Sequence, residues 1–167
     1  MKYTGGVLVW LAASAIGMMI AARFSRREKT LEQLISFVSM TELEISHYSL
    51  VFSEIVEKAA NEKSYDCLLF IPLCFEKIMN GTDFPKAWKE SITEKLPELS
   101  KSDEKKLLSF GDVLSSCDKE GVLNVLSYYK KTFDESLFEA KEARKKYAKL
   151  CVAAGVFAGG VIFMTLI

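Results

Sequence analysis

The sequence predicts an all-α protein in which a bundle of roughly six helices is flanked by one apolar helix at each end. Apolar residues recur at helical spacing, and no run shows the sustained two-residue alternation of strands. The 22 basic and 22 acidic residues cancel, and residues 3–22 and 150–167 contain no charged residue. A charged middle, residues 23–149, therefore lies between two apolar ends.

The two uncharged runs are long enough to cross a bilayer, because 18–20 helical residues reach roughly 27–30 Å. Each has basic residues on its inner side: Arg23, Arg26 and Arg27 after the first, and Arg144, Lys145, Lys146 and Lys149 before the second. Such residues favour the cytoplasmic side. We therefore expect residues 3–22 and 150–167 to span the membrane and contact its lipid, with residues 23–149 in the cytoplasm. A cleaved signal peptide and a buried core helix are the respective alternatives.

Small residues recur on one face of each expected span. Gly155 and Gly159 form a G-x-x-x-G pattern, and Ala13, Gly17 and Ala21 repeat every four residues. Such faces let helices approach closely in lipid. We expect the spans to pack together or against partner spans, and ordinary membrane composition is the alternative.

Between the spans, the first helix has an apolar stripe that includes Leu34 and ends near residues 47–49. A second, shorter helix covers residues 50–59. Ser64 is placed to cap a third helix that runs to Met79, in which Pro72 should kink or restart the helix. A strand over residues 67–71 is the alternative for the strongly apolar start of that segment.

Turn and capping residues delimit the fourth helix. Asn80-Gly81 ends the helix before it, and Thr82 or Asp83 caps its start, with Pro85 in the first turn. Pro97 closes the segment.

The last two helices of the middle follow from similar signals. Ser102 is the expected N-cap of the fifth helix, with acidic residues in the first turn. The sixth begins near residues 117–118 and meets no breaker after Gly121. We expect it to continue into the final span as one helix of about 45 residues.

Motifs for catalysis or cofactor binding are missing from the sequence. His47 is the only histidine, no phosphate-binding glycine loop occurs, and the cysteines Cys67, Cys74, Cys117 and Cys151 form no C-x-x-C pair. The zero net charge argues against a nucleic-acid binder. We expect no enzyme activity, no cofactor, no metal site, no small-molecule substrate, and reduced thiols. A membrane-tethered enzyme using common carboxylates is the alternative.

Four segments carry a family resemblance, and they occur in order along nearly the whole chain. They are Thr41–Tyr48 (TELEISHY), Ala87–Ile92 (AWKESI), Phe110–Asp118 (FGDVLSSCD) and Lys145–Leu150 (KKYAKL). Together with the length and one span at each end, they resemble the stage III sporulation protein AB family of endospore-forming bacteria.

This resemblance implies a cytoplasmic domain like the F domain of type II secretion and type IV pilus platform proteins. It implies a non-enzymatic platform subunit of the sporulation-specific secretion or channel complex between mother cell and forespore. The central domain would lie on the mother-cell side of the membrane that surrounds the forespore. Expected partners are a cytoplasmic secretion-type ATPase and the other membrane subunits. The alternative is a platform-type component of a pilus or type II-like secretion system outside sporulation.

Charged positions on the first two cytoplasmic helices are the expected partner contact: Glu42, Glu44, Glu54 and Lys58. A solvated helical face is the alternative. Leu34, Trp88, Phe110 and Phe133 are expected instead to lie in the core.

Overall fold

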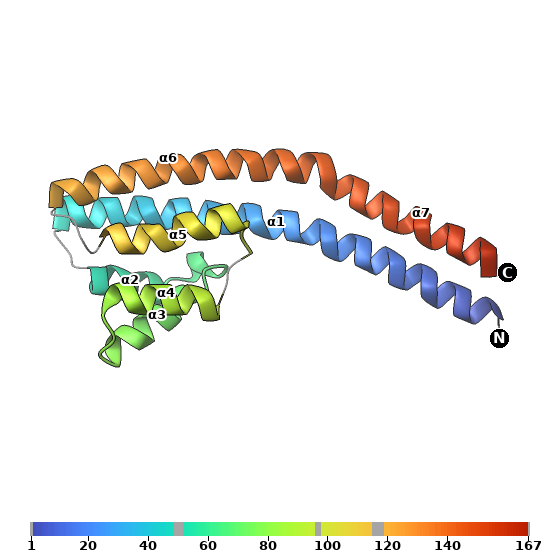
Figure 1. The fold of residues 1–167 in the computed structure, drawn as a ribbon, viewed down its shortest axis with the longest axis horizontal. Coiled ribbons are helices and arrows are strands. Elements are labelled where there is room, and N and C mark those ends of the chain that lie inside the picture. Colours follow the sequence, from blue (N-terminus) through green and yellow to red (C-terminus); the bar gives the residue numbers. More distant parts are fainter. Residues whose placement is uncertain (1, 49–51, 96–97, 115–118, 167) are drawn as a thin grey trace. The chain divides into compact units, whose positions relative to one another are not determined.

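The computed structural model describes residues 2–48, 52–95, 98–114 and 119–166, in which every regular element is a helix (Figure 1). The elements are α1 (Lys2–Tyr48), α2 (Phe52–Ala60), the short 3-10 helix η1 (Lys63–Tyr65), α3 (Phe70–Met79), α4 (Phe84–Glu94), α5 (Lys101–Leu114), α6 (Lys119–Ala143), the π-helix η2 (Arg144–Ala148) and α7 (Lys149–Leu166). The predicted all-α class is confirmed. The strand alternative for residues 67–71 is wrong.

The chain forms two compact units. The helix-pair unit comprises Met1–Glu28 and Phe138–Ile167, and the bundle unit comprises Lys29–Leu137. Helices α1 and α6 contribute to both, and six α-helices contribute to the described part of the bundle unit. The predicted boundaries at residues 22 and 150 do not coincide with these divisions and remain predictions.

The core of the bundle unit is organised around the Trp88 side chain of α4. Its indole ring contacts four aromatic rings at centroid distances of 5.1–6.1 Å, contributed by Phe37, Phe70, Phe84 and Phe110. The indole Nε1 donates a hydrogen bond to the Leu107 carbonyl at 2.9 Å. The ring is therefore fixed by α1, α3, α4 and α5 together, because each supplies at least one contact.

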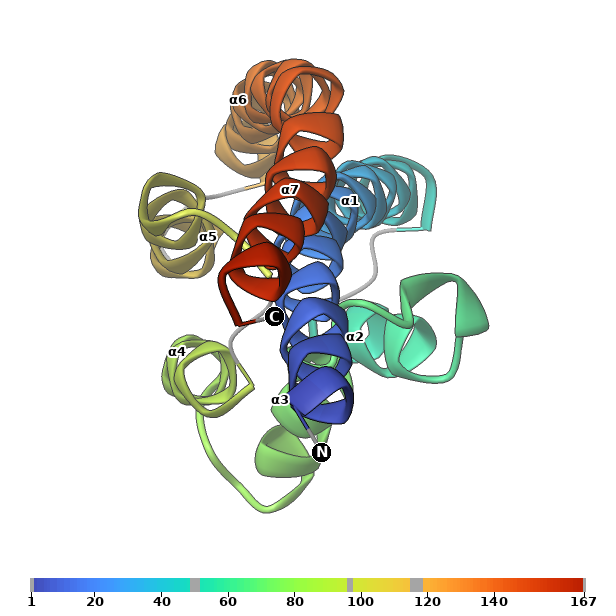
Figure 2. The ribbon, with the colours of Figure 1, turned by 90° about the vertical axis from the view of Figure 1, so that its right-hand side faces the viewer.

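Apolar residues at helical spacing place the other core side chains. Leu34, Trp88, Phe110 and Phe133 are all at most 1% exposed, as predicted. Helix α3 packs against both α2 and α4, and α4 packs against α5 (Figure 2). Burial of each aromatic side chain is a large favourable term for a small domain.

A glycine permits the close approach of α5 to Trp88. A Cβ atom built on Gly111 would lie 2.7 Å from both Cγ and Nε1 of the indole, and closer still to Cδ1. Real Cβ atoms do not approach other atoms so closely. The structure thus brings together two of the sequence segments that carry the family resemblance, through Trp88 and Gly111.

Helix ends agree with the sequence in most places. The α3 helix ends at Met79, and Gly81 adopts a positive φ of 87°, which favours glycine. Asp83 is the N-cap residue of α4, with a proline in the first turn. Pro72 lies in the first turn of α3, so the helix starts near it and does not extend back to Ser64. Pro97 and residues 115–118 lie outside the described residues.

The predicted N-cap of α5 is wrong, because the cap is Ser100 and not Ser102. The Ser100 hydroxyl accepts a hydrogen bond from the Asp103 amide at 3.2 Å, and the Asp103 carboxylate accepts from the Ser100 amide at 3.2 Å. This reciprocal pair is a capping box, with Asp in place of the usual Glu or Gln. Both serines suit a cap by composition, and only Ser100 has an acidic residue three positions later that reaches back.

The predicted long C-terminal helix contains one irregularity. The described helical residues run from Lys119 to Leu166, but Arg144–Ala148 form a π-helix. In a π-helix the hydrogen bonds join residues five apart, and such segments are frequent at functional sites. The predicted continuous helix is therefore confirmed, with one π-helical segment within it.

Candidate functional site

The helix-pair unit places part of the second predicted basic cluster beside α1. Figure 1 shows α7 (red) beside the first half of α1 (blue), with both termini at the same end. Between α1 on one side and α6, η2 and α7 on the other lies an open groove of about 900 Å³, called here the basic groove. It joins residues more than 100 positions apart in the sequence.

One part of the basic groove is cationic. Its charged lining is Lys141, Arg144, Lys145, Lys149 and a single carboxylate, Glu28. The Arg144 Nη1 atom lies 3.0 Å from the Glu28 Oε2 atom, and the Glu28 side chain is only 12% exposed. This ion pair links α1 to η2. It uses one edge of a guanidinium that carries five N–H donors.

The other part of the basic groove is apolar. It is lined by Met18, Ala21, Ala22, Ala148, Val152 and Ala153. Except for Ala148, these residues come from the two uncharged runs, whereas every charged lining residue lies outside them. The groove therefore changes from charged to apolar along the helix pair.

An aromatic contact lies beside the predicted basic residues. Phe24 of α1 stacks on Tyr147 of η2 at a centroid distance of 6.1 Å, and the Lys146 ammonium lies 5.2 Å from the same Tyr147 ring. Lys146 does not line the basic groove, nor do Arg23, Arg26 and Arg27. Only three of the seven predicted membrane-flanking residues thus share it: Arg144, Lys145 and Lys149.

The predicted small-residue faces of α1 and α7 lie against each other. A Cβ atom built on Gly155 would lie 2.9 Å from the Ala13 carbonyl oxygen and 3.1 Å from the Gly17 Cα atom. One built on Gly159 would lie 2.7 Å from the Trp10 ring, whose Nε1 donates to the Val156 carbonyl at 3.3 Å. The two backbones approach so closely that only glycine fits at these positions without a shift.

The predicted partner contact in the bundle unit does not form one uniform surface. Glu44 is 4% exposed and forms an ion pair with Lys58 of α2. Glu42 is half-buried and lies 3.7 Å from the Lys130 ammonium of α6. Glu54 is exposed on α2. Glu44 therefore contributes to joining α1 and α2, and Glu54 and Lys58 are the exposed members of the set.

A polar connection that the sequence analysis missed holds the loop before α3 on α1. Lys29 Nζ lies 2.8 Å from the Asp66 carboxylate, and the Gln33 side chain donates to the same carboxylate. The Gln33 carbonyl oxygen accepts from the Cys67 amide at 2.8 Å. The hydrogen bonds from Lys29 and Gln33 lower the pKa of Asp66 to about 2, and the one from Lys29 has the larger effect. In the sequence, the spacing of four residues between Lys29 and Gln33 already indicated that both lie on one helix face.

The described cysteines, Cys67, Cys74 and Cys151, are free thiols. Cys74 is buried, and burial raises the pKa of its thiol to about 12. Burial also raises the pKa of Cys67. Reactive cysteines have lowered pKa values instead.

Among the described residues, no group of three or more His, Cys, Asp or Glu side chains is placed to hold a metal ion.

The structure also bears on the predicted membrane spans. Within the described part of the chain, no helix combines the length and apolar character needed to cross a membrane. The two predicted spans are therefore not confirmed.

Comparison with known proteins gives one match. The chain matches no curated protein and no solved structure with which it was compared. The model of the family described as stage III sporulation protein AB matches residues 2–167. Because this match covers nearly the whole chain, from the first apolar run to the last, the protein belongs to the stage III sporulation protein AB family.

Proposed function

We propose that this chain is a non-enzymatic membrane platform subunit of the sporulation-specific secretion or channel complex between mother cell and forespore. In this proposal the helix-pair unit anchors the chain in the membrane that surrounds the forespore. The bundle unit, on the mother-cell side, engages a secretion-type ATPase and neighbouring membrane subunits. The membership in a stage III sporulation family is the observation that carries the proposal.

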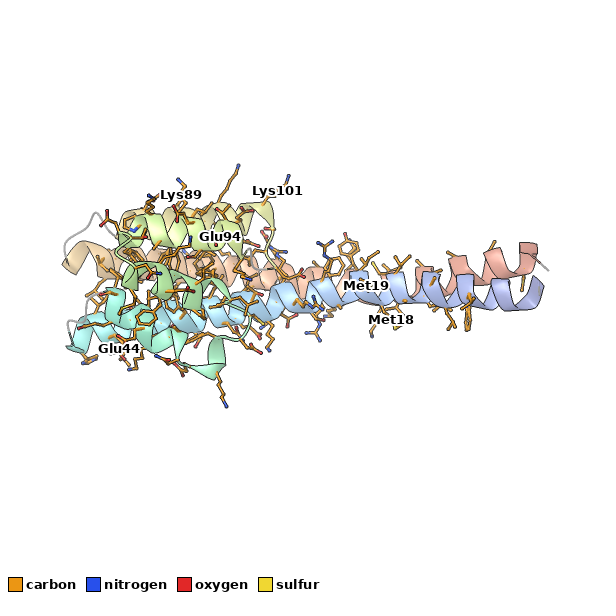
Figure 3. The ribbon with its side chains drawn as sticks, turned by 90° about the horizontal axis from the view of Figure 1, so that it is seen from below. Met18, Met19, Glu44, Lys89, Glu94 and Lys101 are labelled. Carbon is orange, nitrogen blue, oxygen red and sulfur yellow. The ribbon has the colours of Figure 1, made fainter. Side chains whose placement is uncertain are left out.

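Exposed apolar side chains support the membrane anchor. On the helix-pair unit the exposed large hydrophobic residues include Leu8, Leu11, Ile16, Met18, Met19, Leu150, Phe157 and Met164. Figure 3 shows Met18 and Met19 pointing outward from α1. Soluble proteins rarely expose contiguous apolar surface of this kind, and such surface marks contact with protein or membrane. The uncharged runs and their inner basic flanks agree with two spans.

The glycine contacts support a helix pair that works as a unit in lipid. In a membrane no hydrophobic driving force joins two apolar helices, so close packing through small residues takes its place. Gly17, Gly155 and Gly159 provide such packing, because their backbones lie against the opposite helix. We propose that this contact holds the two spans together during assembly with partner subunits.

The anchor is tested by carbonate extraction and cysteine labelling of the full-length chain. We expect the protein to stay in the membrane fraction at high pH. A cysteine introduced at the exposed Lys101 position should react from the cytoplasmic side only. Release of the wild-type chain by carbonate would reject the anchor and leave the family membership standing.

The sporulation role is tested by deletion in an endospore-forming host and complementation with the full-length chain. We expect heat-resistant spores to be lost after engulfment while vegetative growth stays normal. Normal spore yield in a strain without a paralogue would reject the role. It would instead favour a platform component of a pilus or type II-like system.

The partner surface is tested by charge reversal with a matched control. Glu54→Lys reverses an exposed charge of the proposed contact, and Glu135→Lys makes the same change on the exposed face of α6. We expect only the first to weaken co-purification of the ATPase. Because Glu44 pairs with Lys58, the exchange Glu44→Lys with Lys58→Glu keeps the ion pair and separates docking from stability. Unchanged ATPase association in Glu54→Lys and in the variant that exchanges Glu44 and Lys58 would reject this surface.

A further inference from the structure

We propose that the basic groove is a binding site for one anionic phospholipid, which rests on the membrane anchor proposed above. The phosphate of the headgroup would lie against Lys145, Lys149 and Arg144. The upper part of the acyl chains would lie along Met18, Ala21 and Val152. The shared chemistry is a phosphate group, and the attached acyl chains distinguish a lipid from a soluble anion.

An anion would complement the positive charge of the groove. Four basic side chains line it against one carboxylate, and that carboxylate is held by Arg144. Among the described residues, no carboxylate pairs with Lys145 or Lys149. Like charges four residues apart on a helix repel each other. A bound phosphate would relieve this repulsion and accept hydrogen bonds from both ammonium groups.

The π-helix contributes to the geometry of the cationic part. In η2 residues five apart are hydrogen-bonded partners, so Arg144 and Lys149 lie nearly one above the other. In a regular α-helix, at 100° per residue, they would point about 140° apart. Both residues line the groove.

The apolar part of the groove selects a lipid over a free anion. Met18 and Glu28 are ten residues apart on one helix, which corresponds to about 15 Å along the axis. That distance covers a headgroup and several methylene groups. A volume of about 900 Å³ is at the upper end for a ligand site. The alanine and valine side chains along this part cannot hydrogen-bond a hydrated phosphate, but they can pack against an acyl chain.

The position of the groove fits the proposed topology. Its charged residues lie just inside the two uncharged runs, at the level where anionic headgroups of the inner leaflet would meet the chain. Basic pockets between helices at this level are where anionic lipid headgroups bind. Occupancy of the site would therefore depend on the anionic lipid content of the membrane that the protein enters.

Native mass spectrometry of the full-length protein in detergent tests the proposal, with phosphatidylglycerol and phosphatidylcholine of identical acyl chains as probes. We expect one phosphatidylglycerol to be retained in preference to phosphatidylcholine. The variant Lys145→Gln with Lys149→Gln should reduce this preference by about tenfold to thirtyfold. Equal retention of both lipids by the wild-type chain would overturn the proposal.

The matched control is Lys131→Gln with Lys146→Gln, which removes the same charge outside the groove. We expect it to keep the preference, and an equal loss in both double variants would show a non-specific charge effect and reject the site. Ala153→Trp, which fills the apolar part, should reduce lipid retention while the charges stay. If it does not, the acyl-chain part of the proposal is wrong.

Two further measurements separate the sources of failure. Inorganic phosphate at 10-fold excess over lipid should not displace phosphatidylglycerol, and full displacement would assign the groove to a soluble anion. Carbonate extraction of the same variants should leave all of them membrane-bound. A wild-type chain that is released by carbonate rejects the anchor, whereas a membrane-bound chain without lipid preference rejects only the site.

Discussion

The substitution Gly111→Ala gives the sharpest test of the core described above. In an exposed helix interior, Gly→Ala stabilises by about 1 kcal/mol, because alanine has the higher helix propensity. Here the new methyl group would lie 2.7 Å from two atoms of the Trp88 ring and closer to a third. The ring has little room to retreat, because four aromatic side chains surround it and its Nε1 bonds the Leu107 carbonyl.

The magnitude follows from two opposing terms. Overpacking a tight core costs about 1–3 kcal/mol, and the gain in helix propensity offsets about 1 kcal/mol of it. The difference is about 0–2 kcal/mol, and we expect Gly111→Ala to lie in the upper half of this range, because the added Cβ atom would lie closer to the indole than real Cβ atoms approach. Lys105→Ala, at an exposed position of the same helix, should change the stability little.

Urea unfolding of the full-length chain, followed by its helical circular dichroism, measures this difference. The double variant Trp88→Phe with Gly111→Ala should cost less than the sum of its single changes, because the smaller ring leaves space for the methyl group. Wild-type stability for Gly111→Ala, or strict additivity in the double variant, would show that the close approach does not constrain the core.

Four other changes test particular contacts, three of them by urea or acid unfolding and one by cross-linking. Asp66→Asn should reduce the loss of stability that we expect as pH falls from about 4 to 2, because the Asp66 pKa of about 2 lies below its unfolded value of 3.8. An unchanged acid transition would contradict this. Ser100→Ala should cost about 1 kcal/mol through the lost cap. Ser91→Ala should stabilise by about 1 kcal/mol, because the buried Ser91 hydroxyl has no hydrogen-bond partner among the described residues. Gly155→Leu should separate α1 from α7, measured by loss of cross-linking between cysteines placed in the two helices, and unchanged cross-linking would refute it.

Helical periodicity predicted most of the bundle unit. The apolar stripes placed Leu34, Phe110 and Phe133 in the core because a spacing of three or four residues is enough to define a helix face. Phe37, which is 2% exposed, was not among the side chains predicted to lie in the core. It lies at the edge of the apolar stripe of α1, where the rings of Trp88 and Tyr65 contact it. Tertiary contacts of this kind are not visible in periodicity.

The candidate site was predictable only in part. The basic residues near the uncharged runs were evident, but the sequence gives no way to know which of them face one another. Lys141 and Glu28 line the basic groove and were missed, because each looks like any other charge on a solvated helix. Local hydrogen bonding decides this arrangement, and the π-helix of η2 that changes the register has no clear sequence signal.

The Trp88 core has a consequence for the order of events during synthesis. The apolar stripe of α1 around Phe37 leaves the ribosome long before its partners, since Trp88 and Phe110 follow 51 and 73 residues later. At about 5–20 residues per second, the stripe stays uncovered for roughly 4–15 s. A nascent chain that has reached only α3 therefore presents an unprotected hydrophobic helix. Early capture of the first apolar run by the membrane would hold that helix away from other nascent chains until α4 and α5 arrive.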